Sequence, residues 1–294
     1  MKILLTNDDG IFSPGIAAMA KALTRLGTVL IAAPATEQSG VGQAITFLTP
    51  LTLKEVFLNE VFWGYAVEGT PVDCIKLGSN ELMEGKPDLV VSGINNGLNA
   101  GANIIYSGTV AAALEGSYLG ITSFAISVQY SPNVDPAIFQ QAADCALEII
   151  QMILKQENHS GELFNINIPA KVLEQIKKTK ILDPQSIRIV PMDTQSFWHE
   201  YERRNDPSGR RYYWLSGRPL YKQMSRQLSE MTDIETVSKG FITITPLDFN
   251  PTKIEKLREM QQWSFENVSM NSDEDVATDF STQMNFRMSR LTDK

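Results

Sequence analysis

The stretch Ile3-Leu4-Leu5-Thr6-Asn7-Asp8-Asp9-Gly10 decides the fold of this chain, because an apolar run passes directly into a polar turn. A short apolar run of this kind is typical of a buried strand, and Asn-Asp-Asp-Gly is a turn sequence. Apolar residues then recur at helical spacing, at Ile16, Met19, Ala20, Leu23 and Leu26. Gly27 stands where a helix C-terminal cap is expected. The order is therefore strand, polar loop, helix and stop.

The same rhythm of strand and helix continues to about residue 150. We predict further strands at 28–32, 88–92 and 122–128, a small-residue helix at 107–119 closed by Gly120, and a long amphipathic helix at 135–156. Strands alternating with helices of this length pair in parallel through right-handed crossovers. The fold class expected is α/β, a three-layer αβα sandwich with a mainly parallel sheet.

The second half of the chain has a different pattern. Residues 198–201 and 211–215 flank Asn205-Asp206-Pro207-Ser208-Gly209, which predicts a β-hairpin. Residues 232–238 read as a short helix capped by Gly240, and 241–245 as a strand that rejoins a sheet. We therefore expect a core at 1–170, an extension at 171–263 and an acidic, loosely ordered tail at 264–294.

Composition restricts the classes of function. The 294 residues carry a net charge of -8 with 43% hydrophobic residues, so broad binding to a nucleic-acid polymer is not expected. The two cysteines, Cys74 and Cys145, lie in separate apolar stretches and indicate a reducing compartment rather than a disulfide framework. No signal peptide and no membrane span are predicted. We expect a soluble, cytoplasmic protein without a membrane partner.

Polar residues gather in the loops that follow the predicted strands. In an open parallel sheet these loops, at 7–10, 34–42 and 92–97, meet at one edge and bind ligands there. The adjacent carboxylates of Asp8 and Asp9 repel each other, and a hard cation also held by Ser39 and Asn95 would relieve that repulsion. The alternative is that Asn-Asp-Asp-Gly serves only as turn chemistry.

Several other chemistries are disfavoured by what the sequence lacks. With only His159 and His199, a zinc site or a Ser-His-Asp hydrolase is poorly supported, so Mg, Mn or Ca is the more natural ion. No G-x-S-x-G elbow and no phosphate-binding G-x-x-x-x-G-K-[ST] loop occur. The run Gly40-Val41-Gly42-Gln43-Ala44-Ile45 lacks the third glycine of a dinucleotide site, which argues against hydride transfer.

The segment Tyr106-Ser107-Gly108-Thr109-Val110 opens a predicted helix with hydroxyls and a glycine. Free backbone N–H groups at a helix start favour an anion, so the segment suits a phosphate. The alternative is that Ser107 only caps the helix.

Taken together, these motifs resemble the SurE family of 5′(3′)-nucleotidases, the stationary-phase survival proteins. The resemblance covers about residues 1 to 250 and rests on blocks in family order: residues 3–10, Gln38-Ser39, Glu68-Gly69-Thr70-Pro71-Val72-Asp73-Cys74, Ser92-Gly93-Ile94-Asn95, residues 106–110, and Gly240-Phe241-Ile242-Thr243-Ile244-Thr245-Pro246-Leu247. Two departures stand out. Many members have an aspartate before the Tyr-Ser-Gly-Thr motif, where this chain has Ala102-Asn103, and many have an arginine before the serine, where it has Glu37-Gln38.

The resemblance implies a Rossmann-like core, a C-terminal hairpin extension that swaps between subunits, and a dimer or tetramer. It implies one divalent ion per subunit, held by Asp8, Asp9, Ser39 and Asn95, with Asp8 and Asp9 as the catalytic pair. Residues expected near the phosphate or substrate are Asn7, Asn96, Ser107, Gly108 and Thr109. The implied substrates are nucleoside 5′- and 3′-monophosphates and, in some members, short polyphosphate.

The mechanism expected from these residues is metal-assisted attack of water on phosphorus, with Asp8 and Asp9 holding the ion. A covalent aspartyl phosphate is the rival, although such sites usually have two aspartates separated by one residue rather than adjacent. A non-catalytic metal- or nucleotide-binding sensor and a scaffold assembled through the hairpin are the alternatives from other classes.

Overall fold

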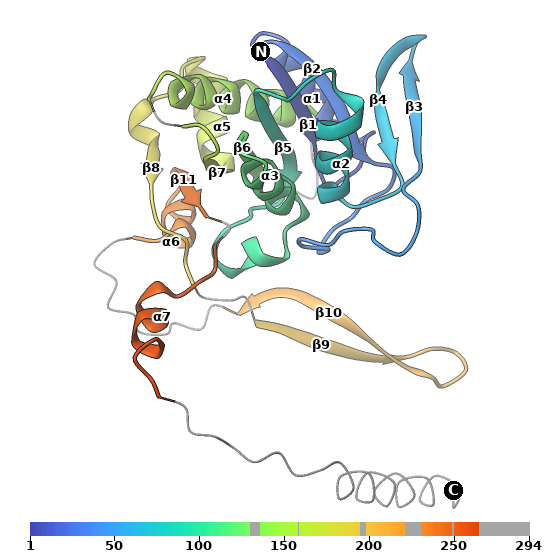
Figure 1. The fold of residues 1–294 in the computed structure, drawn as a ribbon, viewed down its shortest axis with the longest axis vertical. Helices are drawn as coiled ribbons and strands as arrows, with labels where there is room; N and C mark the ends of the chain where they lie inside the picture. The colour runs from blue at the N-terminus through green and yellow to red at the C-terminus, as the bar shows by residue number, and fades with distance from the viewer. Residues whose placement is uncertain (130–135, 158, 195–197, 221–230, 249, 265–294) are drawn as a thin grey trace, which may run out of the picture. The chain divides into compact units, whose positions relative to one another are not determined.

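The structure is a computed structural model that describes residues 1–129, 136–157, 159–194, 198–220, 231–248 and 250–264. Contacts divide the chain into two compact units, Met1–Phe249 and Asn250–Lys294. The first unit contains the main sheet and its covering helices (Figure 1). Within the described part of the second unit, α7 (Ile254–Met260) is a helix of its own. The predicted tail at 264–294 lies, except for its first residue, outside the described residues.

A nine-stranded sheet forms the centre of the first unit, in the order β3-β4-β2-β1-β5-β6-β7-β11-β8. The parallel strands are β1 (Lys2–Thr6), β2 (Thr28–Pro34), β4 (Val61–Val67), β5 (Leu89–Asn96), β6 (Thr122–Val128) and β7 (Leu163–Ile168). At one edge β3 (Leu53–Leu58) is antiparallel to β4. Beyond β7 come antiparallel β11 (Ile242–Leu247) and β8 (Ile187–Ile189), which is parallel to β11.

The strand order locates the point where the sheet topology reverses. Counted along the chain, the parallel strands follow the spatial order 3-2-1-4-5-6 of a Rossmann-like sheet. The chain runs outward from β1 to β2 and β4, and then returns to the other side of β1 with β5. A crevice at the carboxyl ends of β1 and β5 is where such a sheet binds its ligands. The expected α/β fold is confirmed.

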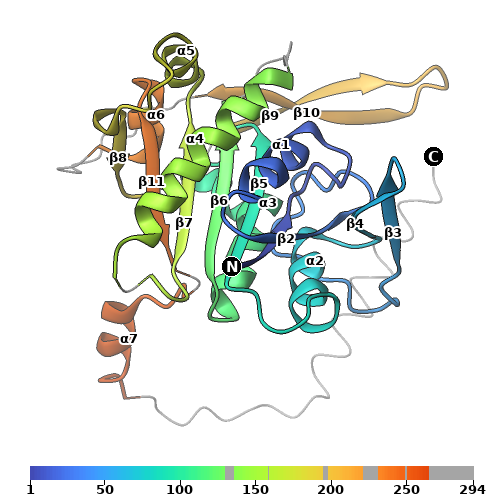
Figure 2. The ribbon, with the colours of Figure 1, turned by 90° about the horizontal axis from the view of Figure 1, so that it is seen from above.

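Helices cover both faces of the sheet (Figure 2). One face packs against α1 (Pro14–Leu23), α4 (Pro136–Leu154) and α5 (Ala170–Thr179), and the other against α2 (Pro71–Leu77) and α3 (Gly108–Tyr118). Because side chains alternate along a strand, Ile3 and Leu5 enter the first core while Leu4 enters the second. All three are fully buried. The apolar opening run of the sequence thus anchors both layers.

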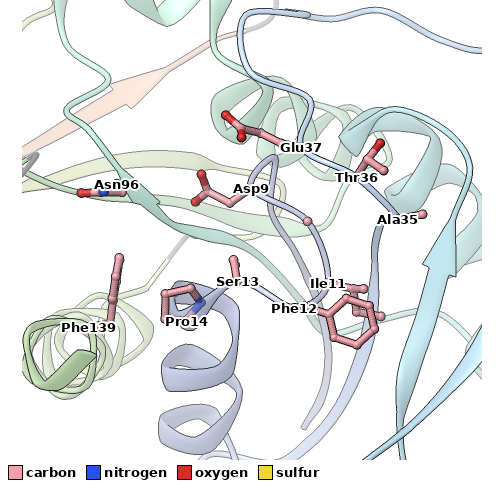
Figure 3. Close-up of a pocket in the computed structure, with 12 residues that line it drawn as sticks. Asp9, Ile11, Phe12, Ser13, Pro14, Ala35, Thr36, Glu37, Asn96 and Phe139 are labelled. Carbon is pink, nitrogen blue, oxygen red and sulfur yellow. The ribbon is translucent and has the colours of Figure 1, made fainter. Parts of the chain in front are cut away.

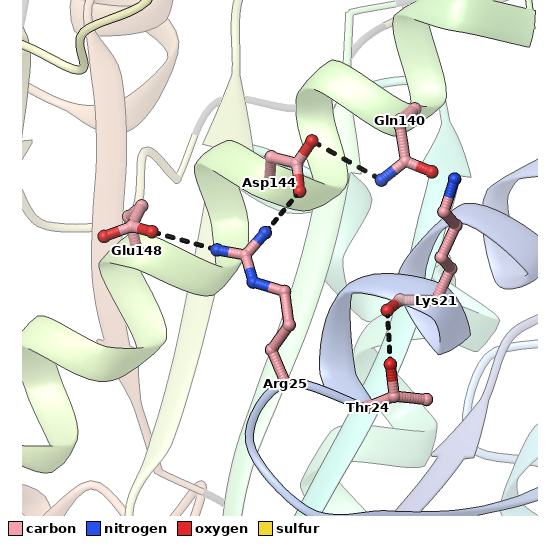
Figure 4. Close-up of polar contacts among 6 residues, drawn as sticks. All are labelled: Lys21, Thr24, Arg25, Gln140, Asp144 and Glu148. Atoms are coloured by element: carbon pink, nitrogen blue, oxygen red, sulfur yellow. Dashed lines mark hydrogen bonds and ion pairs between the residues drawn. The ribbon is translucent and has the colours of Figure 1, made fainter.

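The helices α1 and α4 are also joined at the surface (Figure 4). Arg25, just after α1, pairs with Asp144 at 2.8 Å and with Glu148 at 3.2 Å, both on α4. Each of these side chains is about half exposed. Ion pairs of this kind contribute little, about 0–1 kcal/mol. The apolar contacts beneath them, rather than the charges, hold this layer.

Two glycines predicted to end helices behave differently. The helix of 107–119 ends as expected: Gly120 has φ +70, its N–H bonds to Ser117 O, and Ile121 N–H bonds to Gly116 O, a Schellman cap. The cap prediction at Gly27 is wrong, because α1 already ends at Leu23. A side-chain carbon at Gly27 would lie 2.1 Å from Met1 O, so this glycine permits a close approach of two backbone segments.

The remaining predicted elements are present with shifted ends. The hairpin forms from β9 (Trp198–Asn205) and β10 (Arg211–Leu220), which make a separate two-stranded sheet. Helix α6 (Asp233–Ser238) begins at the Thr232 cap, and β11 rejoins the main sheet beside β7. The elements that we did not predict are β3, β4, α2, β7, α5, β8 and α7, with the short helical turns η1 (Gly78–Leu82), η2 (Gly101–Tyr106) and η3 (Pro184–Ser186).

Helix α4 is long and apolar enough to cross a membrane by length and composition alone. It lies in the main core instead, where Ala142, Ala146 and Ile150 are fully buried. Its opposite side carries the charged partners of Arg25 (Figure 4). This arrangement is that of an amphipathic core helix.

Candidate functional site

The loop after β1 is held by the Asn7 side chain. Its amide donates to Gly10 O at 3.1 Å and to Ser13 Oγ at 2.7 Å, and its oxygen accepts the Gly10 N–H at 3.2 Å. Asn7 is fully buried, and Gly10 has φ +96, a conformation that favours glycine. Asn7 and Gly10 therefore do form the turn that we gave as the alternative interpretation of Asn-Asp-Asp-Gly. It fixes the loop that presents the two following aspartates.

The side chain of Asp8, in the loop after β1, contacts the start of helix α3. Its Oδ1 accepts a 2.6 Å hydrogen bond from Thr109 Oγ1, and a side-chain carbon at Gly108 would come within 2.9 Å of Asp8 Cβ. Asp8 is 5% exposed, and burial raises the pKa of its carboxyl, although the Thr109 hydrogen bonds act in the opposite direction. Gly108 is thus required for the close contact between the β1 loop and the start of α3.

Asp9 is less buried than Asp8, but two other carboxylates, those of Asp8 and Glu37, act on it. Burial, then the charge of Asp8, then that of Glu37 raise the pKa of Asp9 to about 7, while a backbone hydrogen bond from Asn96 lowers it. Figure 3 shows the carboxylates of Asp9 and Glu37 on the same side of the pocket. Three acidic groups therefore act on one small region, and none of the causes of these shifts is a cationic side chain.

Ser39 lies in the loop after β2, and this loop is tied to the β1 loop by a 2.7 Å hydrogen bond from Gln38 N–H to Asp8 O. The Ser39 hydroxyl donates to Glu37 Oε1 at 2.6 Å. A hydroxyl whose hydrogen is donated elsewhere keeps its lone pairs for another ligand. Glu37 is a residue that we did not select from the sequence. Its position two residues before Ser39, in the same loop, was the available signal.

Asn95 and Asn96 end β5 next to β1. The Asn95 amide donates to Gly97 O at 2.7 Å, and its oxygen accepts no hydrogen bond from the described residues. The backbone of Asn96 reaches the Asp9 carboxylate. The structure thus brings the ends of β1 and β5 together, as expected at the reversal point of the sheet.

The loop that continues from β5 is fastened by Asn99. Its backbone N–H donates to Asn167 Oδ1 at 2.8 Å. Its backbone carbonyl oxygen accepts hydrogen bonds from the side-chain amides of Asn165 at 2.7 Å and Asn167 at 3.0 Å. The side-chain amide of Asn99 donates to Ser127 Oγ at 2.9 Å. One loop residue therefore links β5 to β6 and β7.

The start of α3 is capped by a serine side chain. Ser107 Oγ accepts the Val110 N–H at 3.1 Å, so the capping alternative is correct as a description of this contact. Within the described residues the Ser107 hydroxyl donates to no group, so its hydrogen is available to a ligand. Thr109 instead directs its hydroxyl to Asp8. Its role as an Asp8 partner was not predicted.

A pocket of about 460 Å³ opens beside the acidic cluster. Asp9, Glu37 and Asn96 line its polar side, and Phe12 and Phe139 lie on its apolar side (Figure 3). This is the size range of small-molecule sites, about 300–1,000 Å³. His159 is elsewhere, with its ring 3.3 Å from Thr122 Oγ1.

The donor set has the chemistry of a hard-cation site. It offers the carboxylates of Asp8 and Asp9, the hydroxyl of Ser39 and the amide oxygen of Asn95, all oxygen donors of the kind that Mg and Mn prefer. Across the described parts of the chain, no group of three or more His, Cys, Asp or Glu side chains could hold a metal. A zinc-type site is therefore not indicated.

Comparison with known proteins finds close relatives. The family model described as "Survival protein SurE" matches residues 3–189. A 5′-nucleotidase SurE of Rhodopirellula baltica is 48% identical over 90% of this chain and 99% of its own length. The 5′-nucleotidase SurE 1 of Thermus thermophilus is 41% identical over 86% of this chain and 93% of its own. The crystal structure of the Sure protein from Aquifex aeolicus has a TM-score of 0.71 at 35% identity, covering 89% of this chain and 98% of that one.

Proposed function

This chain belongs to the SurE family, and we propose that its site uses one divalent cation to hydrolyse nucleoside monophosphates. The protein is a 5′-nucleotidase, a phosphoric monoester hydrolase, as are the relatives that match almost the whole chain. The sensor without turnover is not favoured, because these relatives are named as enzymes.

The observation that carries the cation proposal is the uncompensated acidic cluster. Burial, then the charges of Asp8 and Glu37, raise the pKa of Asp9, and no cationic side chain among the described residues offsets these charges. Buried like charges are costly unless a counter-charge is supplied. We assign the cation to Asp8, Asp9, Ser39 and Asn95. Bound there, it would polarise a phosphoryl oxygen and lower the pKa of a water molecule.

The chain's own residues would orient both the aspartates and the substrate. Thr109 holds Asp8 by its 2.6 Å hydrogen bond, and Glu37 holds the hydroxyl of Ser39. The Ser107 hydroxyl and the N–H of Gly108 face the anion position at the start of α3. Asn96 would contact the substrate from the β5 end. Direct contact between Asn7 and the substrate stays a prediction, since its described hydrogen bonds stay within the loop.

The test is release of phosphate from a panel of 5′- and 3′-nucleoside monophosphates and a short polyphosphate. Each is measured with EDTA, and then with added Mg or Mn, on the wild type and on Asp9→Asn. We expect release to require the metal and to be lost in the variant. The panel also ranks the bases and tests the 3′ and polyphosphate activities.

Two results would count against this assignment. Full turnover in EDTA would remove the cation from the mechanism. Wild-type turnover of both Asp8→Asn and Asp9→Asn at saturating metal would show that the cation, if present, is held elsewhere. A Ser39→Ala variant serves as an intermediate case, because it removes only one neutral ligand.

We also propose that the hairpin of the extension (171–263) swaps between subunits of a dimer or tetramer, with the 1–170 core providing the site. The support is the exposure of Tyr201, Tyr213, Trp214 and Leu215 on a two-stranded ribbon. Isolated hairpins are marginal in water, and exposed aromatic clusters mark interaction sites. Sedimentation of the wild type against a chain lacking residues 198–220 tests this, and an unchanged mass would contradict it.

The compartment that we propose is the cytoplasm. Cys74 and Cys145 are both free and buried, on different sides of the sheet. Free thiols are the usual state in a reducing compartment. Fractionation of cells that express the chain tests this proposal.

A further inference from the structure

A second pocket lies farther along the carboxyl edge of the sheet. Its volume is about 410 Å³, and it opens between the loop that follows β5 and helix α6. The apolar side chains in its walls are Leu98, Ala100, Pro169, Ile234 and Val237. Ligands bind beyond the carboxyl ends of parallel strands, and this pocket adjoins the ends of β5, β6 and β7.

The charged residues that line this pocket are lysines. Lys171 and Lys239 both belong to its walls, and no carboxylate in the described residues pairs with either. Lys239 Nζ has a 2.8 Å contact with Met231 Sδ, a weak acceptor. Both lysines are exposed to solvent at this pocket. They indicate an anionic ligand.

The backbone adds to this positive potential. Helix α5 begins at Ala170 immediately beside the pocket; the Ala170 N–H donates to Gln129 Oε1 at 3.1 Å, and the cap residue Pro169 offers no side-chain hydrogen bond. Helix starts carry partial positive charge. Gly240, with φ +86, allows the Lys171 stem to pass closely, since a side-chain carbon there would lie 2.6 Å from Lys171 Cδ. The Lys171 stem is thus seated at the pocket wall.

This pocket has the opposite electrostatic character to the catalytic one. Asp9 and Glu37 line the catalytic pocket, whereas Lys171 and Lys239 line the second. The loop after β5 contributes to both, with Asn96 in the first and Leu98 and Ala100 in the second. Without a cation, the second pocket is therefore the more favourable of the two for a phosphate.

We propose that this second pocket binds a small organic phosphate, with the phosphate between Lys171 and Lys239 and the organic part against the apolar walls. The pocket volume lies within the range of small-molecule sites, about 300–1,000 Å³. The apolar walls favour a nucleoside monophosphate over inorganic phosphate, which has no organic part to bury. The site does not depend on the catalytic cation and exists beside it.

The experiment is calorimetric titration of the intact protein in EDTA with adenosine 5′-monophosphate and, separately, with inorganic phosphate. EDTA removes metal-dependent binding and prevents turnover at the catalytic site. We expect saturable binding of the nucleotide, tighter than that of inorganic phosphate. Lys171→Gln/Lys239→Gln should weaken it by about tenfold or more, the equivalent of losing a charge-assisted hydrogen bond.

A matched control lies on the same helix. Lys177→Gln/Lys178→Gln removes the same charge from exposed positions in the last turn of α5 and should leave binding unchanged. Ile234→Phe fills the pocket without changing charge and should also weaken binding. Thermal melts of each variant verify that it is folded.

Asp9→Asn separates the two pockets. It removes a negative charge from the catalytic pocket, so a nucleotide bound there would bind more tightly, whereas one in the second pocket would be unaffected. The proposal is overturned by the absence of saturable binding in EDTA, by an equal loss in the Lys177/Lys178 control, or by tightening in Asp9→Asn.

Discussion

Two regions of this protein bury aspartates near the carboxyl edge of the sheet, and they satisfy them in different ways. Asp233 is fully buried, and its oxygens accept the N–H groups of Gly101, Asp193 and Ile234, each at 2.8 Å. Asp8 accepts a hydroxyl from Thr109 and lies beside a second carboxylate, Asp9.

The difference teaches what each carboxylate is for. Burial raises the pKa of Asp233 as it does that of Asp8; three backbone hydrogen bonds oppose this rise without cancelling it, and the charge of Asp193 adds to it. These bonds join α6 to the loop after β5, and so Asp233 serves the fold. Asp8 also accepts hydrogen bonds, from the Thr109 side chain and from backbone N–H groups, but Asp9 lies beside it and Glu37 lies nearby. This concentration of negative charge supports our proposal that the pair binds a cation.

The largest effect that we expect is on catalysis at Asp9. Asp9→Asn should reduce phosphate release by at least about a hundredfold, equivalent to about 2.7 kcal/mol, through loss of the cation. In EDTA its melting temperature should not fall, because one like charge has been removed. Phosphate release with Mn and thermal melts in EDTA measure both. A marked fall in the melting temperature would instead show that Asp9 stabilises the fold, as Asp233 does.

At Asp233 we expect the reverse pattern. Asp233→Ala leaves three N–H groups without their acceptor and should cost about 3 kcal/mol of unfolding free energy, which added metal does not restore. Urea unfolding measures this. Asp233→Asn keeps one acceptor oxygen and is the milder control. A loss below about 0.5 kcal/mol, the range of neutral surface changes, would show that these bonds are replaced by water.

The pH dependence of metal binding should distinguish the regions further. With the pKa of Asp9 at about 7 in the metal-free protein, a proton competes with the cation below that pH and not above it. Mn affinity should therefore rise about tenfold per pH unit up to about pH 7 and then level off. Calorimetry between pH 5.5 and 8.5 measures this, with Asp233→Asn as the variant that keeps the slope. A flat profile would contradict the assignment of Asp9 as a ligand.

The smallest effect concerns Glu37. Glu37→Gln removes the negative charge of the group that accepts the Ser39 hydroxyl hydrogen bond. We expect it to weaken Mn binding by about tenfold, the smaller of the effects usual for residues that hydrogen-bond to a metal ligand. Calorimetry in the absence of nucleotide reads this directly. Glu55→Gln, on the exposed edge strand β3, is the control with the same charge change. Equal losses in both variants would indicate a general charge effect only.

Much of the fold and of the site arrangement was readable from the sequence. The apolar runs ending in Asp8-Asp9 and in Asn95 predicted two parallel strands whose ends meet, and β1 and β5 are neighbours. The fully buried strand β6 was predicted at 122–128, with the bounds that the structure shows. These signals are local, and the βαβ rules convert them to topology.

What was missed depends on weaker or non-local signals. The edge strand β3 and its neighbour β4 are partly exposed and alternate irregularly. The start of α2 was readable in principle, since Thr70, Pro71 and Asp73 form a capping box with proline at the first turn. The contact of Glu37 with Ser39 and that of Thr109 with Asp8 depend on side-chain directions that spacing does not give.

The four hydrogen bonds of Asn99 affect how fast its loop opens and how much conformational entropy the loop keeps. A loop fastened to two neighbouring strands opens only when those strands separate, so its amide hydrogen should exchange with deuterium as slowly as those of β6. Its conformational freedom was already given up when the chain folded. Nucleotide bound at the proposed site, beside Asn95 and Asn96, would therefore order little new backbone and leave more of its contact energy as affinity.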